Sequence, residues 1–329
     1  MRKIEFFLLQ KYRTMTNTTL RVLSYNIYWG GHQQPLERTI EVIGESGAEL
    51  VGIQENVNRE YEDQTPEIAK ALGFSYVRHA VLDALEEFGA KGNKLRARWT
   101  QQAGQSTLSC HPITAQSPGG SGIQVVLPSG EKVWMFNTHL WHYPYVPYQL
   151  LNVDFFEGEA IDPNAHDAEA QAILSARIGH ETEINKVLWD IKSILPSGEP
   201  VFLTGDFNEP SHLDWTEEAA QAGLYPLKVD YPTSRQVLKA GLKDAFREFY
   251  PDPVAVPGFT WPAGIYPDAP DSSVPDPEDR IDFVYFSGAN VHVKKVQRLG
   301  NVSDNSEISF AEYPSDHRAL LAEFELPEN

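Results

Sequence analysis

Short apolar runs rich in β-branched and aromatic residues recur along the chain and predict strands. They occupy residues 20–29, 49–55, 106–110, 122–128, 132–140, 200–208, 281–286 and 319–326. Residues 36–47, 67–73 and 168–194 instead have the spacing of apolar positions that is typical of amphipathic helices. Because the order is neither a strict alternation of strands and helices nor strands alone, the pattern predicts a mixed α/β sandwich.

We expect residues 19–329 to form a single domain, because no linker-like stretch divides the predicted elements. Residues 1–18 are expected to be an N-terminal extension, with disorder as one interpretation and Met15 as an alternative start. Their apolar run is short and no small-residue cleavage site follows it, which favours a cytoplasmic protein. No apolar run approaches the ~20 residues that a membrane-spanning helix requires.

Two long insertions interrupt the predicted domain. Residues 141–165 are rich in aromatic residues and proline, and residues 262–279 are rich in proline and acidic residues. Loops of this length in a compact domain are usually functional or disordered. Because the first insertion directly follows His139, we expect it to be a lid over the substrate, with a cover for the sandwich edge as the alternative.

The formal net charge of −19 opposes a general attraction to polyanions, so nucleic acid is the less favoured partner. One basic run, Lys91, Lys94, Arg96 and Arg98, is interpreted as a solvated loop, with a phosphate-steering patch as the alternative. Cys110 is the only cysteine, which excludes an internal disulfide and a cysteine-rich zinc site. Its strand-like context predicts a small buried side chain.

Polar residues stand where several predicted strands end, and they carry the candidate chemistry. A carboxylate at the tip of a buried strand is costly unless a metal ion or another cation compensates its charge. Carboxylates, asparagines and histidines together make an oxygen-rich site with acid/base partners, as magnesium-assisted phosphoryl chemistry requires. The residues are Asn26, Glu55, His139, Asp206, Asn208, Arg280, Asp282, Asp316 and His317.

The segments around these residues are YNIYWG, GIQE, TLSCHPI, NTHL, GDFN, RIDFVYF and SDHRAL. In order and approximate spacing they resemble the motifs of the endonuclease/exonuclease/phosphatase superfamily over residues 20–327. This superfamily includes DNase I-like nucleases, abasic-site endonucleases, sphingomyelinases and inositol polyphosphate phosphatases. The resemblance implies a four-layer α/β sandwich, with two mixed β-sheets packed face to face between flanking helices. It also implies a phosphoester hydrolase that uses Mg²⁺, with Mn²⁺ as a substitute.

The resemblance further implies roles for single residues. Glu55 would be the main carboxylate ligand of the metal ion, with Asn26 beside it and Asp316 as a third residue of the metal site. Asp206 and Asn208 would orient the scissile phosphate and the attacking water.

Two histidines would exchange protons with the substrate. His139 matches the position that protonates the leaving oxygen, and His317 suits the role of base because a carboxylate can hold its imidazole. The spacing of the RIDF motif favours Asp282 over Asp279 as that carboxylate. Relatives differ on whether Asp206 or His317 accepts the proton, so both remain candidates.

The substrate-binding candidates are Trp141, Tyr143 and Tyr145 in the first insertion, together with Arg280. The remaining histidines match no motif and are interpreted as surface or loop residues: His142, His166, His180, His212 and His292. His111 in TLSCHPI resembles a strand-end element in which relatives often have a basic residue, so a phosphate contact there is expected to be weakened.

The acidic charge and the lack of Lys/Arg clusters near the motifs favour a small or lipid-like organic phosphate, cleaved as a phosphodiester, as the substrate. A DNase I-like or abasic-site nuclease is the alternative. A non-catalytic binding protein with the same fold is an alternative of another class, but a pseudoenzyme would typically have lost a ligand or a histidine. The sequence leaves the oligomeric state open.

Overall fold

The computed structural model describes residues 18–31, 34–60, 62–79, 104–153, 159–263, 277–303 and 305–326 of the 329-residue chain. The proposed N-terminal extension, apart from Thr18, and the basic run at residues 91–98 lie outside the described residues. So does most of the second insertion, residues 264–276. Within the described ranges, no helix combines the length and the apolar character needed to cross a membrane.

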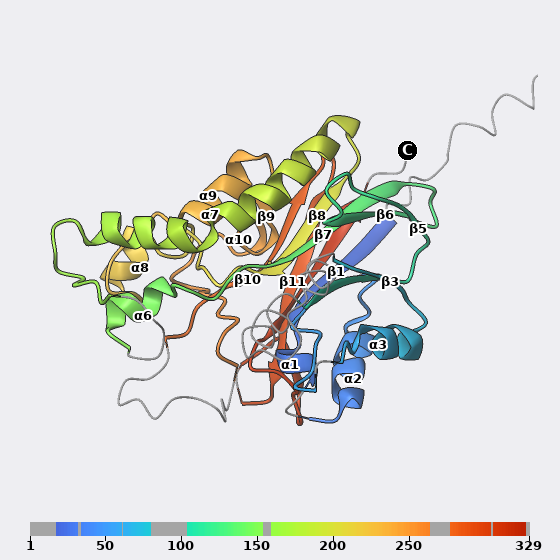
Figure 1. Cartoon of the computed structure of the whole chain (residues 1–329), viewed down its shortest axis with the longest axis horizontal. Helices are drawn as coiled ribbons and strands as arrows, with labels where there is room; N and C mark the ends of the chain where they lie inside the picture. Colours follow the sequence, from blue (N-terminus) through green and yellow to red (C-terminus); the bar gives the residue numbers. More distant parts are fainter. Residues whose placement is uncertain are drawn as a thin grey trace, which may run out of the picture.

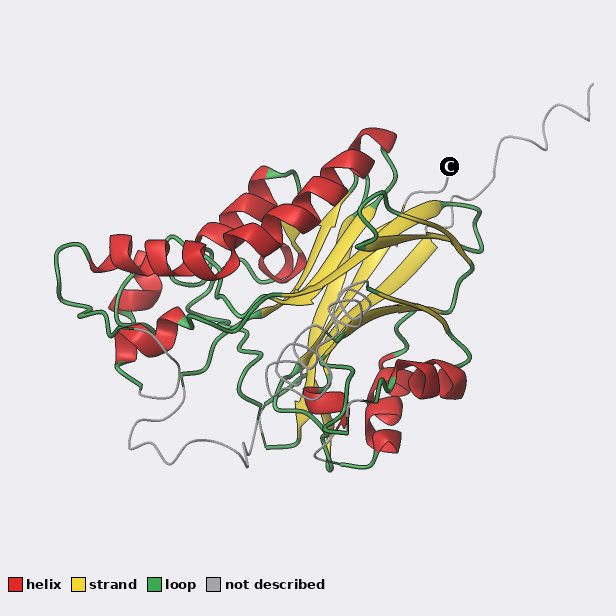
Figure 2. Ribbon diagram, viewed as in Figure 1, coloured by secondary structure: helices red, strands yellow, loops and turns green. Residues whose placement is uncertain are grey.

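Two mixed β-sheets form the centre of the molecule (Figures 1 and 2). The seven-stranded sheet has the order β12-β11-β13-β1-β2-β4-β3, and the six-stranded sheet has the order β5-β6-β7-β8-β10-β9. The strands are β1 (Thr18–Asn26), β2 (Leu50–Gln54), β3 (Ser75–Arg78), β4 (Gln105–Ser109), β5 (Ile113–Gln116), β6 (Gly122–Val126), β7 (Lys132–His139), β8 (Val201–Asp206), β9 (Lys243–Asp244), β10 (Asp282–Ser287), β11 (His292–Asn301), β12 (Ile308–Phe310) and β13 (Ala319–Leu326).

Helices cover the outer faces of both sheets. In Figure 1, α2 and α3 lie beside the seven-stranded sheet, and α7 and α9 lie along the six-stranded sheet. The helical segments are α1 (Tyr28–Gly31), α2 (Leu36–Ser46), α3 (Thr65–Leu72), α6 (Val146–Leu151), α7 (Ala168–Ile194), the 3₁₀ turn η1 (Leu195–Ser197), α8 (Glu217–Gln221), α9 (Pro232–Lys239) and α10 (Ala245–Phe249). The structure confirms the four-layer α/β sandwich that the family resemblance implied.

The alternation of side chains along β1 shows how the layers are held together. Leu20 and Val22 lie in the core between the two sheets, whereas Leu23 and Tyr25 lie in the core that packs against α2 and α3. Since successive side chains of a strand point to opposite faces, a central strand in such a sandwich is apolar on both. This is why β1 has apolar residues at both alternating sets of positions.

A buried polar seam joins the two sheets just before the strands end. Asn137 of β7 donates through Nδ2 to the carbonyl of Ile53, 2.9 Å away, and its Oδ1 accepts from Gln54 Nε2 at 2.6 Å and from Thr204 Oγ1 at 3.0 Å. The sheets approach so closely here that a Cβ on Gly52 would lie 2.0 Å from Thr204 Oγ1. The seam therefore fixes the spacing of the strand ends, where the predicted site residues follow.

The first insertion differs from the expected lid. Tyr145, Tyr148 and Val153 are buried and pack with Trp261 and Ile281 in a core cluster of their own. Residues 141–144, at the start of the insertion, are half-exposed, and residues 159, 160, 162 and 164 near its end are exposed. The expectation of a lid over the whole of residues 141–165 was therefore wrong for residues 145–153. The sequence indicated a loop here, but the aromatic side chains of this segment belong to the hydrophobic core.

Candidate active site

The strand register gathers the predicted site residues at one end of the sandwich. In the six-stranded sheet, His139 pairs with Asp206 across β7 and β8, and Asp206 pairs with Asp282 across β8 and β10. In the facing sheet, Asn26 of β1 pairs with Gln54 of β2, and Glu55 follows directly. Asn26 and Asp206, 180 positions apart in the chain, thus become neighbours because the strand ends coincide.

Asn26 connects the two sheets at the centre of the site. Its Nδ2 lies 3.2 Å from Glu55 Oε1, 2.9 Å from Asp206 Oδ2 and 3.4 Å from His317 Nε2. Its Oδ1 accepts the backbone N–H of Tyr28 at 3.0 Å, which fixes the orientation of the amide. The amide therefore presents Nδ2 to the two carboxylates, and the place of Asn26 beside the metal ion stays a prediction. It acts as a donor that orients Glu55 and Asp206.

Glu55 is held in a strained backbone conformation just beyond β2. Its φ is 55°, in the left-handed region that residues with a side chain seldom adopt. The carboxylate Oε2 accepts the backbone N–H of Trp29 at 3.0 Å, and the Glu55 carbonyl accepts the N–H of Gly30. The turn after β1 therefore positions this half-buried carboxylate toward the site.

Asp206 lies between two histidines. Its Oδ2 is 3.4 Å from His139 Nε2 and 3.7 Å from His317 Nε2, and its Oδ1 accepts the backbone N–H of Asn208 at 2.9 Å. Asn208 also donates through Nδ2 to the carbonyl of Leu140 at 2.9 Å. This contact ties the turn after β8 to the residue that follows His139.

His317 is oriented by Asp282, as the RIDF spacing predicted. His317 Nδ1 lies 2.9 Å from Asp282 Oδ2, and the Thr260 hydroxyl oxygen accepts the backbone N–H of Asp282 at 3.1 Å. Asp279 lies elsewhere and accepts hydrogen bonds from Tyr145 and Trp215. The alternative partner for His317 is therefore excluded by geometry.

Burial and mutual charge set the protonation of these groups. Burial opposes the charged form of both members of the Asp206–His317 pair, but their attraction prevails. It lowers the pKa of Asp206 to about 2, and Asp282, Asp206 and Asp316 raise the pKa of His317 to about 10. The pKa of His139 is also raised, because Asp206 and then Glu55 outweigh its burial. Before any cation binds, the site therefore holds an ionised Asp206 facing a protonated His317.

The donor set fits a divalent cation. Ligand atoms of Asp206, Asp282 and His317 all lie within 4.8 Å of one another. Burial, followed by the charge of Glu55, raises the pKa of Asp316 to about 7. Among the described residues, the buried Oδ1 of Asp316 has no hydrogen-bond partner, while Oδ2 accepts from Trp261 at 3.2 Å. An acidic cluster with an unsatisfied buried carboxylate oxygen is a chemically suitable cation site.

Two of the four residues predicted to bind substrate are buried where a substrate cannot contact them. Arg280 is fully buried and pairs with Asp214 at 2.9 Å and with Asp244 at 2.8 Å, so it cannot reach a substrate. Tyr145 is buried and donates its hydroxyl to Asp279. These placements correct both assignments. Trp141 and Tyr143, two and four residues after His139, are half-exposed, and their role in substrate binding stays a prediction.

His180 was missed as a positioning residue because it matches no motif. It was expected at the surface, yet it is buried in α7, where Nδ1 lies 2.7 Å from Glu209 and Nε2 lies 2.7 Å from the carbonyl of Trp141. Glu183, also in α7, accepts the Trp141 N–H at 2.7 Å. Both backbone polar groups of Trp141 are thus fixed. No signal in the sequence connects α7 with the residue two positions after His139.

The Endonuclease/Exonuclease/phosphatase family model matches residues 23–317. This chain belongs to that family. Members of the family are hydrolases that act on phosphoester bonds. The chain is 30% identical over 228 residues to the uncharacterized protein F14F9.5 of Caenorhabditis elegans, and the match covers 65% of this chain and 67% of that protein.

Solved structures share the fold of this family member. An endonuclease/exonuclease/phosphatase from Beutenbergia cavernae aligns with a TM-score of 0.51 and 16% identity over 94% of this chain and 72% of that chain. The 3′ phosphatase NExo from Neisseria, bound to a product DNA hairpin, aligns with a TM-score of 0.51 and 16% identity over 93% of this chain and 99% of that chain. At these identities the likeness concerns the fold alone.

Proposed function

We propose that the chain is a Mg²⁺-dependent phosphoester hydrolase that uses in-line attack by water. The observation that carries this proposal is the convergence of His139 and His317 on one carboxylate oxygen of Asp206, at 3.4 Å and 3.7 Å. In-line displacement places the attacking and leaving oxygens on opposite sides of phosphorus. His139 on one side, and Asp206 held by His317 on the other, would provide a proton-transfer group for each side.

Glu55 and Asp316 would hold the metal ion, and Asn26 would keep the Glu55 carboxylate in place. When bound, Mg²⁺ or Mn²⁺ would stabilise negative charge on the phosphate and on the leaving oxygen. The expected ligands are hard oxygen atoms, which suits Mg²⁺ better than a softer cation.

Asp206 is the stronger candidate for orienting and deprotonating the attacking water. The carboxylate is ionised, whereas His317 carries a proton unless the bound cation lowers its pKa. In this division of roles, His317 stabilises the developing charge and His139 protonates the leaving oxygen.

A small or lipid-like organic phosphate is one candidate substrate. The half-exposed rings of Trp141, His142 and Tyr143 pack together, with centroids of His142 and Tyr143 3.8 Å apart, directly after His139. Such a patch offers an apolar surface for the organic part of a substrate. The net charge of −19 also disfavours a long polyanion.

DNA is a second candidate of equal standing. The Neisseria structure contains a product DNA hairpin. In this chain, the Arg59 guanidinium lies 5.1 Å from the centre of the Trp29 ring, and the Trp29 N–H contacts Glu55. An aromatic ring with an arginine beside a metal carboxylate suits a stacked base and its phosphate.

A metal-dependence screen tests the proposal and separates the candidates. The substrates are plasmid DNA, a 3′-phosphorylated oligonucleotide, sphingomyelin, bis-p-nitrophenyl phosphate and p-nitrophenyl phosphate, each with Mg²⁺, Mn²⁺ or EDTA. We expect turnover of at least one substrate that requires the metal and is lost in Asp206→Asn. Equal turnover in EDTA, or equal activity of Asp206→Asn, would refute the hydrolase assignment. The preferred substrate identifies the class.

A further inference from the structure

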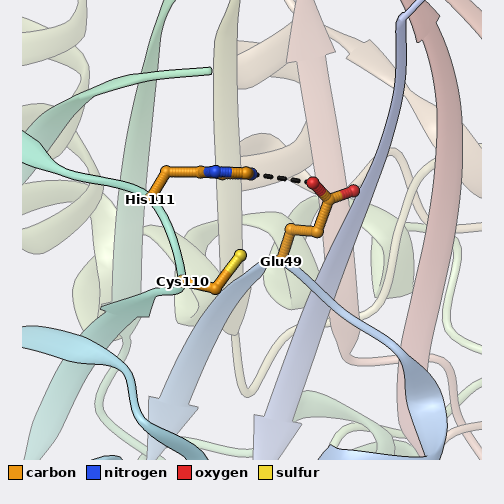
Figure 3. A group of neighbouring side chains, drawn as sticks. All are labelled: Glu49, Cys110 and His111. Carbon is orange, nitrogen blue, oxygen red and sulfur yellow. Dashed lines mark hydrogen bonds and ion pairs between the residues drawn. The ribbon is translucent and has the colours of Figure 1, made fainter. Parts of the chain in front are cut away.

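A second group of potential metal ligands lies at the opposite end of β2 from Glu55. It consists of Glu49, just before β2, and of Cys110 and His111, just after β4, and Figure 3 shows the three side chains turned toward one another. One ligand atom from each residue lies within 4.8 Å of the other two. Cys110 is exposed, which corrects the expectation of a buried packing residue.

The backbone fixes these residues as neighbours. β2 and β4 are antiparallel, with Leu50 opposite Ser109, so the residue before one strand adjoins the residue after the other. The Cys110 N–H donates to the Glu49 carbonyl at 3.0 Å. The Ser109 hydroxyl contacts both the N–H and the carbonyl of His111 at 2.9 Å. The pairing of β2 with β4 and the two hydrogen bonds of the Ser109 hydroxyl therefore fix the positions of these residues.

The side chains are already oriented toward a shared point. His111 Nε2 lies 2.7 Å from Glu49 Oε2, and the backbone N–H of Arg21 contacts the other oxygen, Oε1, at 3.3 Å. The His111 side chain is 9% exposed, and that of Glu49 is 29% exposed. A cation bound to both atoms would need them roughly 3.3 Å apart at usual zinc distances, so the pair must open by only about half an ångström.

We propose that Glu49, Cys110 and His111 form a Zn²⁺ site that is separate from the catalytic centre. Thiolate, imidazole and carboxylate are the ligands that zinc takes in proteins, whereas Mg²⁺ prefers oxygen ligands alone. Three protein ligands with an exposed side leave a fourth position for water. The two cation sites of this chain would thus differ in chemistry and lie at opposite ends of the same strand.

Zinc binding would be coupled to loss of a proton from Cys110. Since only the thiolate binds the metal, each bound ion would release that proton and affinity would fall as pH falls.

Cobalt substitution gives a selective test, because Cys110 is the only cysteine in the chain. Co²⁺ is titrated into the full chain in the presence of a reductant that contains no thiol and of excess Mg²⁺, which competes for the oxygen-rich site. A sulfur-to-cobalt charge-transfer band must then come from Cys110. We expect this band at one Co²⁺ per chain, its loss in Cys110→Ser, and its displacement by Zn²⁺.

Variants of the other ligands decide whether the site is built from all three residues. Even loss of an outer-shell partner typically weakens metal binding about 10–100-fold, so Glu49→Gln and His111→Asn should each weaken it at least about tenfold. The matched controls are Glu45→Gln and His166→Asn, at exposed positions outside the group. These controls should bind Co²⁺ as the unaltered chain does.

Three results would overturn the proposal: absence of the band, a band of unchanged affinity in both Glu49→Gln and His111→Asn, or half-stoichiometric binding with dimerisation in analytical ultracentrifugation. The last would show a thiolate shared between two chains. Circular dichroism verifies that each variant is folded. Alkylation of Cys110 by iodoacetamide provides a second measurement, since Zn²⁺ should slow it in the unaltered chain and leave it unchanged in His111→Asn.

Discussion

Replacing Asp279 with asparagine should stabilise the protein at alkaline pH while leaving its activity intact. The Asp279 carboxylate is fully buried, and it accepts hydrogen bonds from the Tyr145 hydroxyl at 2.8 Å and from Trp215 Nε1 at 3.0 Å. Burial raises its pKa from 3.8 to about 7, although both hydrogen bonds act in the opposite direction. An asparagine can keep both contacts, because its amide accepts from Trp215 and donates to the tyrosine oxygen.

The direction of the pH dependence follows from the raised pKa. Below pH 3.8 the folded and unfolded states are both protonated at Asp279. Between that value and about 7 the folded protein retains a proton that the unfolded chain has released, so this residue's contribution to stability falls as pH rises. Above about pH 7 the carboxylate is ionised in both states, and its full destabilising effect is present. A rise of the pKa from 3.8 to about 7 corresponds to a destabilisation of about 4 kcal/mol as an upper limit.

Urea unfolding at several pH values gives the free energy of unfolding of Asp279→Asn and of the unaltered chain. The difference between these two free energies measures the effect. We expect the difference to be near zero at pH 4 and to favour the variant by about 1–4 kcal/mol at pH 8. Asp162→Asn, at an exposed position, is the matched control and should show no such trend. A variant that is destabilised equally at both pH values would refute the reasoning, because the hydrogen bonds rather than the charge would then dominate.

Measurements of turnover distinguish the role of Asp279 from that of Asp282. Asp282→Asn removes the carboxylate that contacts His317 Nδ1 at 2.9 Å, so turnover should fall about 10²-fold or more. Asp279→Asn should retain most of its turnover under the same conditions. The reverse order would mean that the family motif has been assigned to the wrong aspartate.

Three further outcomes are expected. Glu55→Gln should abolish metal-dependent turnover without unfolding, measured with bis-p-nitrophenyl phosphate and circular dichroism; unchanged activity would remove the metal assignment. His139→Ala should impair an aryl ester less than an alkyl ester because p-nitrophenolate needs little protonation, whereas His317→Ala should impair both alike; identical dependence on the leaving group would refute this division of roles. Arg280→Met should lower the free energy of unfolding by about 3–5 kcal/mol because Asp244 loses its cation, whereas a higher KM at unchanged stability would restore a substrate-binding role.

The sequence was informative about the site where a charge ends an apolar strand. Glu55, His139 and Asp206 each follow residues that are buried on both sides, so their polarity demands a functional or structural explanation. Neighbouring parallel strands end at the same edge of a sheet, as β1 and β2 do and as β7 and β8 do, so polar residues at their ends lie close together. The helix at residues 168–194 was equally clear, because its length and periodicity leave little alternative.

The position of polar residues at strand ends did not predict how their side chains are oriented. Asn26 was correctly placed at the site, but its amide direction depends on the N–H of Tyr28, which binds Oδ1 only once the turn after β1 has formed. Arg280 was expected to bind substrate. Its neighbours across the core, Asp214 and Asp244, come from segments with no shared motif, so no local pattern predicts their pairing.

The assignment of His111 shows why strand direction matters. TLSCHPI was interpreted as a strand-end element in which relatives often have a basic residue, so that a phosphate contact at His111 was expected to be weakened. In the structure β4 is antiparallel to β2, so Gly104 at the start of β4 adjoins Asn56 near the site, while His111 lies at the far end. A run of apolar residues predicts a strand equally well in either direction, because side-chain alternation is unchanged when the chain is reversed. The same reversal that removes His111 from the phosphate places it beside Glu49 and Cys110.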